Sequence, residues 1–149
     1  MTDTSIQPCD ELAVGGLLPM FRHVVTRTDI VRYAGAGGDF NPIHHDDDYA
    51  RHAGFPSVFA MGLMHASFLS RVLYDACGPL AVKRYRIRFT HPVFPGDQLT
   101  GGGVVEERRQ TDSGVLLVCR LFMKNQNDRD VLAGDADLML TPAGTGATP

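Results

Sequence analysis

The sequence predicts an α+β fold in which an antiparallel sheet covers one long, buried helix. Residues 62–77 (GLMHASFLSRVLYDAC) are apolar around most of a helical circumference, which is typical of a helix buried on all sides. After Gly78-Pro79 the apolar period changes: residues 84–89 alternate strictly between apolar and charged, as a half-buried strand does. Strand-like segments then continue to residue 140. Helices followed by a run of strands favour an α+β domain with an antiparallel sheet.

The remaining elements follow from local signals. Thr26 with Asp29 three positions later forms a capping box, which predicts a helix over 27–36 that ends in glycines. A short strand precedes it at 20–25, and a short helix is expected near 47–52. After the long helix we expect a meander of four strands at 84–89, 98–110, 115–124 and 131–140. The third is apolar on both faces and should be central. The concave side of the sheet should cover the long helix.

Length and charge limit the classes of protein. The chain has 149 residues, which predicts a single domain over 1–149, with an ordered core from about 14 to 141, a loose N-terminal arm and a flexible tail at 142–149. The net charge of −3 argues against a nucleic-acid partner. No apolar run reaches the ~18 residues of a membrane span. The N-terminus shows no signal peptide, so a cytoplasmic location is expected.

The three cysteines predict no disulfide framework. Cys9, Cys77 and Cys119 are odd in number and form no CxxC pair. The simplest interpretation is three free thiols in a reducing compartment.

Ionisable residues gather in the long segment 37–57, which is rich in Gly, Pro, Asp and His. Loops of this length in compact domains are often functional. Asn41-Pro42 favours a tight turn that brings Asp39 and His44 together as a general acid–base pair acting on one water. The alternative is that Asp39 only caps the turn at Asn41.

The run His44-His45-Asp46-Asp47-Asp48 also resembles a metal-binding sequence, but adjacent residues diverge too much to chelate one ion, and no HExxH-type spacing exists. We therefore expect no metal, and we expect the aspartates to cap the following short helix.

Two motifs resemble one family. Residues 38–50 (GDFNPIHHDDDYA) are similar to the hydratase motif of the MaoC-like dehydratases and (R)-specific enoyl-CoA hydratases. Residues 88–97 (RFTHPVFPGD) resemble the strand–turn signature of the same family. Residues 61–64 (MGLM) stand where the family usually has His-Gly-Met-Leu. Spacing and order agree from about residue 14 to residue 141.

The resemblance implies the hotdog fold and a homodimer, with an acyl-thioester tunnel near the subunit interface. It implies that Asp39 and His44 activate a water that adds to C3 of a trans-2-enoyl thioester, or the reverse dehydration of a (3R)-hydroxyacyl thioester. It also implies that the backbone N–H of Gly62 stabilises the thioester oxyanion. The reaction needs no cofactor, and CoA or acyl-carrier protein carries the acyl group of the substrate.

Other residues are expected to bind substrate. We expect Asn41 to orient the loop or the water. The depth of the tunnel depends on Phe40 and Met61, and Ser67 lines the tunnel. Three arginines on one strand face contact phosphates or, alternatively, form only a solvated face: Arg84, Arg86 and Arg88. His65 is expected to be a packing group of the long helix.

The family histidine before Gly62 is replaced by Met61. This departure suggests an unusual acyl group, or a non-catalytic subunit of a heteromeric dehydratase in which a related hotdog chain is the partner. A hotdog acyl-CoA thioesterase is a further alternative, against which the Asp39–His44 spacing argues.

Overall fold

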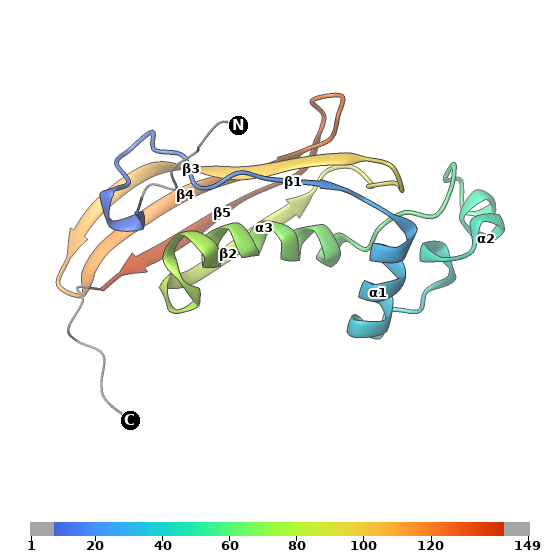
Figure 1. The fold of residues 1–149 in the computed structure, drawn as a ribbon, viewed down its shortest axis with the longest axis horizontal. Coiled ribbons are helices and arrows are strands. Elements are labelled where there is room, and N and C mark those ends of the chain that lie inside the picture. The colour runs from blue at the N-terminus through green and yellow to red at the C-terminus, as the bar shows by residue number, and fades with distance from the viewer. Residues whose placement is uncertain (1–7, 142–149) are drawn as a thin grey trace.

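The computed structural model describes residues 8–141 and contains one antiparallel sheet with three α-helices (Figure 1). The sheet has five strands in the order β1-β3-β4-β5-β2. Their bounds are Phe21–Val24 for β1, Val82–Phe89 for β2, Gln98–Thr111 for β3, Gly114–Lys124 for β4 and Asp130–Leu140 for β5. The helices are α1 (Arg27–Gly37), α2 (Asp47–His52) and α3 (Gly62–Cys77). The expected tail at 142–149 lies outside the described residues.

The helix predictions are confirmed closely. The Thr26 side chain accepts from the Asp29 N–H, and Asp29 accepts from the Thr26 N–H, so the capping box starts α1 as expected. Gly38 ends α1 in the left-handed region at φ 70°. Asp46 caps α2 by accepting from the N–H groups of Asp48 and Tyr49.

The expected four-stranded meander is wrong. β3, β4 and β5 do form a meander with β4 at the centre, but β2 pairs with β5 and not with β3. The register places Arg84 opposite Asp137 and Arg86 opposite Asp135, so opposite charges meet across the β2–β5 pair. β2 therefore becomes an edge strand, with one side of its backbone unpaired in the described chain.

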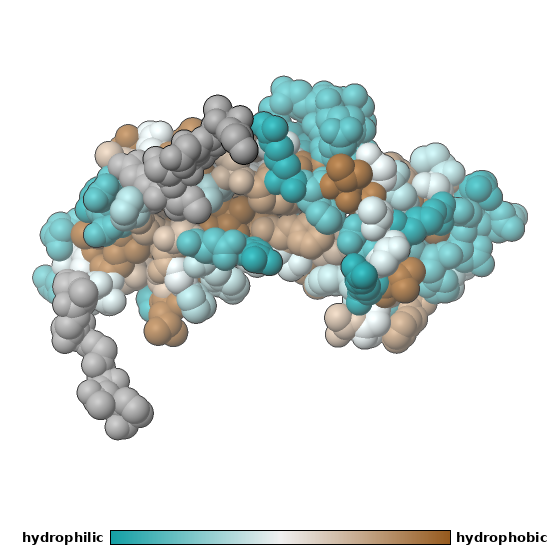
Figure 2. All heavy atoms as spheres, in the orientation of Figure 1, coloured by the Kyte–Doolittle hydropathy of each residue, from teal (hydrophilic) through white to brown (hydrophobic). Residues whose placement is uncertain are grey.

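Helix α3 runs under the sheet along its length, and hydrophobic residues fill the space between them (Figures 1 and 2). Met64, Leu69 and Leu73 are fully buried against the sheet. The Tyr85 hydroxyl on β2 donates to the Ala66 carbonyl and ties the helix to the sheet. The opposite face of α3 is exposed in the described chain, which corrects the expectation of burial on all sides; its residues are Leu63, Ser67, Arg71, Tyr74 and Asp75.

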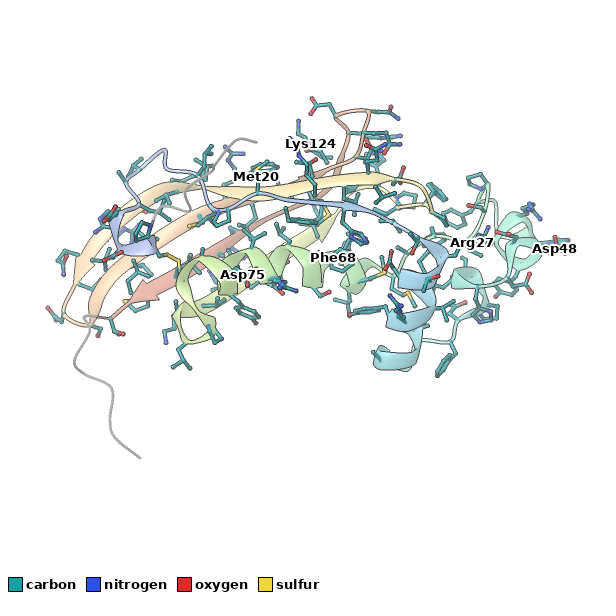
Figure 3. All side chains as sticks on the ribbon, viewed as in Figure 1. Met20, Arg27, Asp48, Phe68, Asp75 and Lys124 are labelled. Atoms are coloured by element: carbon teal, nitrogen blue, oxygen red, sulfur yellow. A yellow bond between two sulfur atoms is a disulfide. The ribbon has the colours of Figure 1, made fainter. Side chains whose placement is uncertain are left out.

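Residues 8–16 are bound more firmly than the expected loose arm, of which residues 1–7 lie outside the described part of the chain. Cys9 and Leu12 are buried in the core, and a disulfide joins Cys9 to Cys77 at the end of α3 (Figure 3). The expectation of three free thiols is thus wrong for this pair, whose Cα atoms lie 5.3 Å apart. No sequence motif predicts a contact between two cysteines separated by 68 positions. Cys119 is free and buried in β4.

No helix among residues 8–141 is long and apolar enough to cross a membrane. The polar segments lie at the periphery, over the β4–β5 hairpin and around α2 (Figure 2).

Candidate active site

The site lies between the loop that follows α1 and the N-terminus of α3. Asn41 caps a 3₁₀ turn at Pro42–His44 by accepting from the Ile43 N–H. Asp39 Oδ1 accepts from the Asn41 N–H at 3.3 Å, so Asp39 does cap the turn. The same turn brings the second carboxylate oxygen, Oδ2, to 3.6 Å from His44 Nε2. Capping and pairing with the histidine are therefore compatible, because each uses a different oxygen.

The orientation of His44 is set by the backbone. Its Nδ1–H donates to the Phe59 carbonyl at 2.8 Å. A carbonyl oxygen only accepts, so Nδ1 carries a proton, and Nε2 is the ring nitrogen that can accept one. The ring is 9% exposed and meets the Phe59 ring edge to face. His44 thus presents a basic nitrogen toward Asp39.

The segment that carries the Phe59 carbonyl is held from both sides. Asp47 Oδ1 accepts from the Val58 N–H at 3.0 Å, and the Ala60 N–H donates to the Val93 carbonyl at 2.8 Å. Asp47 also pairs with Arg27 at the start of α1, near α2 (Figure 3). The Val58 N–H and the Arg27 guanidinium lower the pKa of Asp47. Asp47 therefore connects α1 and α2 to the segment that carries the Phe59 carbonyl, whereas Asp46 caps α2.

The strand–turn signature at residues 88–97 holds the segment that orients His44. Val93 belongs to the turn that closes the strand–turn signature, and Gly96 in that turn has φ 95°. Asp97 Oδ2 accepts from the Phe94 N–H, which stabilises the turn. The two sequence motifs therefore meet in space through the contact between Ala60 and Val93.

A cavity of about 270 Å³ joins the Asp39–His44 pair to the N-terminus of α3. Tyr33, Gly37, Leu63 and Phe89 complete its lining, together with the predicted site residues Asp39, His44, Met61 and Gly62. Met61 is the N-cap of α3 and makes no side-chain cap, so first-turn N–H groups are left for other acceptors. The positive end of the helix dipole favours negative charge at this point.

Gly62 is required for close packing as well. A Cβ at this position would lie 2.8 Å from Cζ of Phe89, whose ring covers the glycine. Phe89 was not predicted as a site residue. Its place in the strand–turn signature is the signal that could have identified it.

Several predicted substrate-binding residues do not meet in this cavity. Phe40 is 65% exposed and does not line this cavity. Ser67 lies on the exposed face of α3 and donates to the Met64 carbonyl. Arg84 makes a bidentate contact with Asp137. Their roles in binding substrate stay predictions.

The three arginines of β2 differ from one another. Arg84 and Arg86 both pair with aspartates of β5. Arg88 is exposed, and no carboxylate of residues 8–141 pairs with it. Within the same residues, no group of three or more His, Cys, Asp or Glu side chains is placed to hold a metal ion.

The fold and the placement of an Asp–His pair beside a helix N-terminus define a class, the hotdog-fold proteins of the MaoC-like type. Residues 19–119 match the family model of the MaoC like domain, and the chain belongs to that family. It is 29% identical over 130 residues to a mitochondrial 3-hydroxyacyl-[acyl-carrier-protein] dehydratase of Arabidopsis thaliana, covering 87% of this chain and 78% of that protein. Three other curated relatives are much longer, and the match covers less than a third of each.

Solved structures agree with this assignment. The R-hydratase PhaJ1 of Pseudomonas aeruginosa superposes with a TM-score of 0.79 at 26% identity, covering 95% of this chain and 93% of that one. A chain of the ChsH1-ChsH2 complex of Mycobacterium tuberculosis superposes with a TM-score of 0.74 at 27% identity, covering 86% and 98%.

Proposed function

We propose that this protein is a hydro-lyase that adds water to trans-2-enoyl thioesters to give (3R)-hydroxyacyl thioesters, or catalyses the reverse dehydration. The observation that carries the proposal is the Asp39–His44 pair, which lines one cavity with Gly62 at the N-terminus of α3. The names of the relatives, a 3-hydroxyacyl dehydratase and an R-hydratase, support the same chemistry.

In this mechanism a water molecule contacts both Asp39 Oδ2 and His44 Nε2. Nε2 takes a proton from the water as its oxygen bonds to C3, and the π electrons of the C2–C3 bond move toward the thioester carbonyl. The Gly62 N–H donates to the resulting enolate oxygen, where one well-placed donor is worth roughly 3–4 kcal/mol. His44 then returns the proton to C2. The elements of water are thus added across the double bond, and neither a metal nor a redox cofactor takes part.

We propose that CoA or an acyl-carrier protein carries the acyl group of the substrate as a thioester. We also propose that the protein is a homodimer. The unpaired edge of β2 and the exposed Leu63 and Tyr74 of α3 are features that a second copy can cover. The M. tuberculosis structure is a complex of two components, ChsH1 and ChsH2, and a heteromer is therefore the alternative. Light scattering of the purified protein distinguishes a monomer from a dimer.

The test of function is an assay of crotonyl-CoA and longer trans-2-enoyl-CoAs, in which loss of the enoyl-thioester absorbance is followed together with release of free thiol. The proposal expects loss of absorbance without thiol release, and no loss in the Asp39→Asn/His44→Ala double variant. Thiol release at the same rate would favour a thioesterase. Turnover that the double variant retains would overturn the mechanism.

A further inference from the structure

His65 is a buried polar side chain that the proposed mechanism does not use. It lies one turn into α3 and is 2% exposed. Neither ring nitrogen meets the geometry of a hydrogen bond with any group of residues 8–141, although the Met61 carbonyl one turn earlier lies close enough to act on the ring. Leaving a buried polar group unpaired costs free energy, and such groups in native structures call for an explanation. The same position would accept a leucine without that cost.

Burial keeps the ring neutral. Desolvation lowers the pKa of His65 to about 4, an effect that the Met61 carbonyl one turn earlier partly offsets. A neutral imidazole has one N–H donor and one nitrogen acceptor. It can therefore pair with a ketone oxygen or with a hydroxyl group.

His65 lines a second cavity, of about 350 Å³, beside the catalytic one. Its walls are mainly aromatic or apolar, from Phe55, Phe59, Ala60 and Pro92. Thr90 and His91 also line it, but each already contacts the Asp130 carbonyl. Gly62 and Phe89 line both cavities.

The Phe89 ring separates the two cavities and covers His65. The two rings meet at an interplanar angle of 76°, with centroids 5.4 Å apart. Phe89 is 45% exposed and lies at the end of the edge strand β2, so its ring has room to move. Rotation of the ring away from Gly62 joins the cavities and uncovers the imidazole.

We propose that His65 is a specificity-determining residue whose imidazole hydrogen-bonds an oxygen carried by the acyl group of the substrate, after the Phe89 ring moves aside. This inference rests on the proposed function, because it places the acyl group in the cavity next to the acid–base pair. The aromatic walls suit the carbon skeleton, and the single unpaired imidazole suits one hydroxyl or ketone remote from the thioester. A plain hydrocarbon chain would leave His65 unpaired.

The test is a set of binding measurements with saturated thioesters, which cannot be hydrated. Octanoyl-CoA is compared by calorimetry with octanoyl-CoAs that carry a hydroxyl group at successive positions from C5 to C8. The full-length wild-type protein is expected to bind one of the hydroxylated compounds roughly tenfold more tightly than octanoyl-CoA, since a hydrogen bond of ordinary strength gives about that factor. Equal affinity for the whole series would overturn the proposal.

Four variants, one of them a control, identify the residue responsible. His65→Leu is expected to reduce the tenfold preference to about onefold, while His65→Gln, which keeps a donor and an acceptor, retains several-fold. Phe89→Ala is expected to strengthen binding of the preferred compound, because no ring has to move. His91→Leu is the matched control for a second imidazole in the same cavity and should keep the preference.

The contradicting outcomes are distinct. An unchanged preference in His65→Leu, or its loss in His91→Leu alone, would assign the oxygen to another residue. An equal loss of affinity for every thioester in His65→Leu would point to the pantetheine arm common to all of them, and would also overturn the proposal. Because binding is measured without turnover, a protein that shows the preference but hydrates no enoyl-CoA would contradict the proposed function and not the role of His65.

Discussion

Asp39 Oδ2 lies 3.6 Å from His44 Nε2, while the other oxygen and the other nitrogen of the pair are held by backbone groups. The distance is too long for a direct hydrogen bond. It allows one water to contact both atoms, and the backbone bonds keep those two atoms directed toward the cavity. The pair is therefore preorganised as a unit rather than as two independent groups.

If the pair acts as a unit, its substitutions should be strongly non-additive. Asp39→Asn and His44→Ala should each lower kcat/KM for the preferred enoyl-CoA by at least ~100-fold, the usual scale of general acid–base catalysis. The double variant should be only slightly worse than the poorer single variant. His45→Gln is the matched control, since this neighbouring histidine is exposed and only contacts the Phe40 carbonyl. Additive losses would show that the two groups act in separate steps.

Gly62→Ala should disturb the packing at the N-terminus of α3. The new Cβ meets the Phe89 ring at 2.8 Å, so the half-exposed ring must shift, and the cost should lie near the lower end of the roughly 1–3 kcal/mol by which overpacking reduces the free energy of unfolding. In a Phe89→Leu background the same substitution should cost less stability, because the smaller side chain leaves room. Urea unfolding of the four proteins measures this coupling. Equal destabilisation in both backgrounds would mean that the ring moves away freely and that the cost arises elsewhere.

The arginines of β2 should contribute unequally to substrate binding. Arg88 has no carboxylate partner in the described chain, whereas Arg84 is held by Asp137 and Asp135. Arg88→Ala should raise KM for a CoA thioester several-fold and leave KM for the matching N-acetylcysteamine thioester unchanged, because only CoA carries phosphates. Arg84→Ala should change neither KM by more than a small factor. A larger effect in Arg84→Ala would mean that its ion pairs open when substrate binds.

Local sequence signals predicted most elements of this fold, and non-local contacts account for the failures. The capping box at Thr26 and Asp29 needs only neighbouring residues, so the start of α1 was predictable. The position of β2 depends on pairing with β5, about 50 positions away along the chain, and the alternating pattern of the strand alone does not specify that partner. The Asp39–His44 pair was predictable because both residues lie on one turn. The cover that Phe89 provides over Gly62 and His65 was not, because it joins a strand end to a helix.

The buried His65 should make stability fall in acid. Its pKa is lowered from 6.5 to about 4 in the folded protein, so the unfolded chain binds the proton more readily between these values. The free energy of unfolding is therefore not reduced by this ring above pH 6.5. It decreases by up to about 3 kcal/mol as the pH falls toward 4. In His65→Leu and His65→Gln the decrease between pH 7 and pH 4 should be smaller by that amount. Parallel stability curves for all three proteins would show that the ring is protonated in the folded state.

The disulfide between Cys9 and Cys77 should stabilise the protein by anchoring the N-terminal segment to the end of α3. It links residues 68 positions apart, and cross-links of this kind contribute about 2–4 kcal/mol, mainly by restricting the unfolded chain. Reduction with dithiothreitol should therefore lower Tm in the wild-type protein but not in the Cys9→Ser/Cys77→Ser variant.

A count of thiols checks the same bond directly. Air-oxidised protein should release one reactive thiol on unfolding, Cys119, and three after reduction. Before unfolding Cys119 should not react, because it is fully buried and burial raises its pKa to about 11, which removes the reactive thiolate at neutral pH. Three reactive thiols in unfolded, unreduced protein would contradict the disulfide and restore the free-thiol interpretation of the sequence.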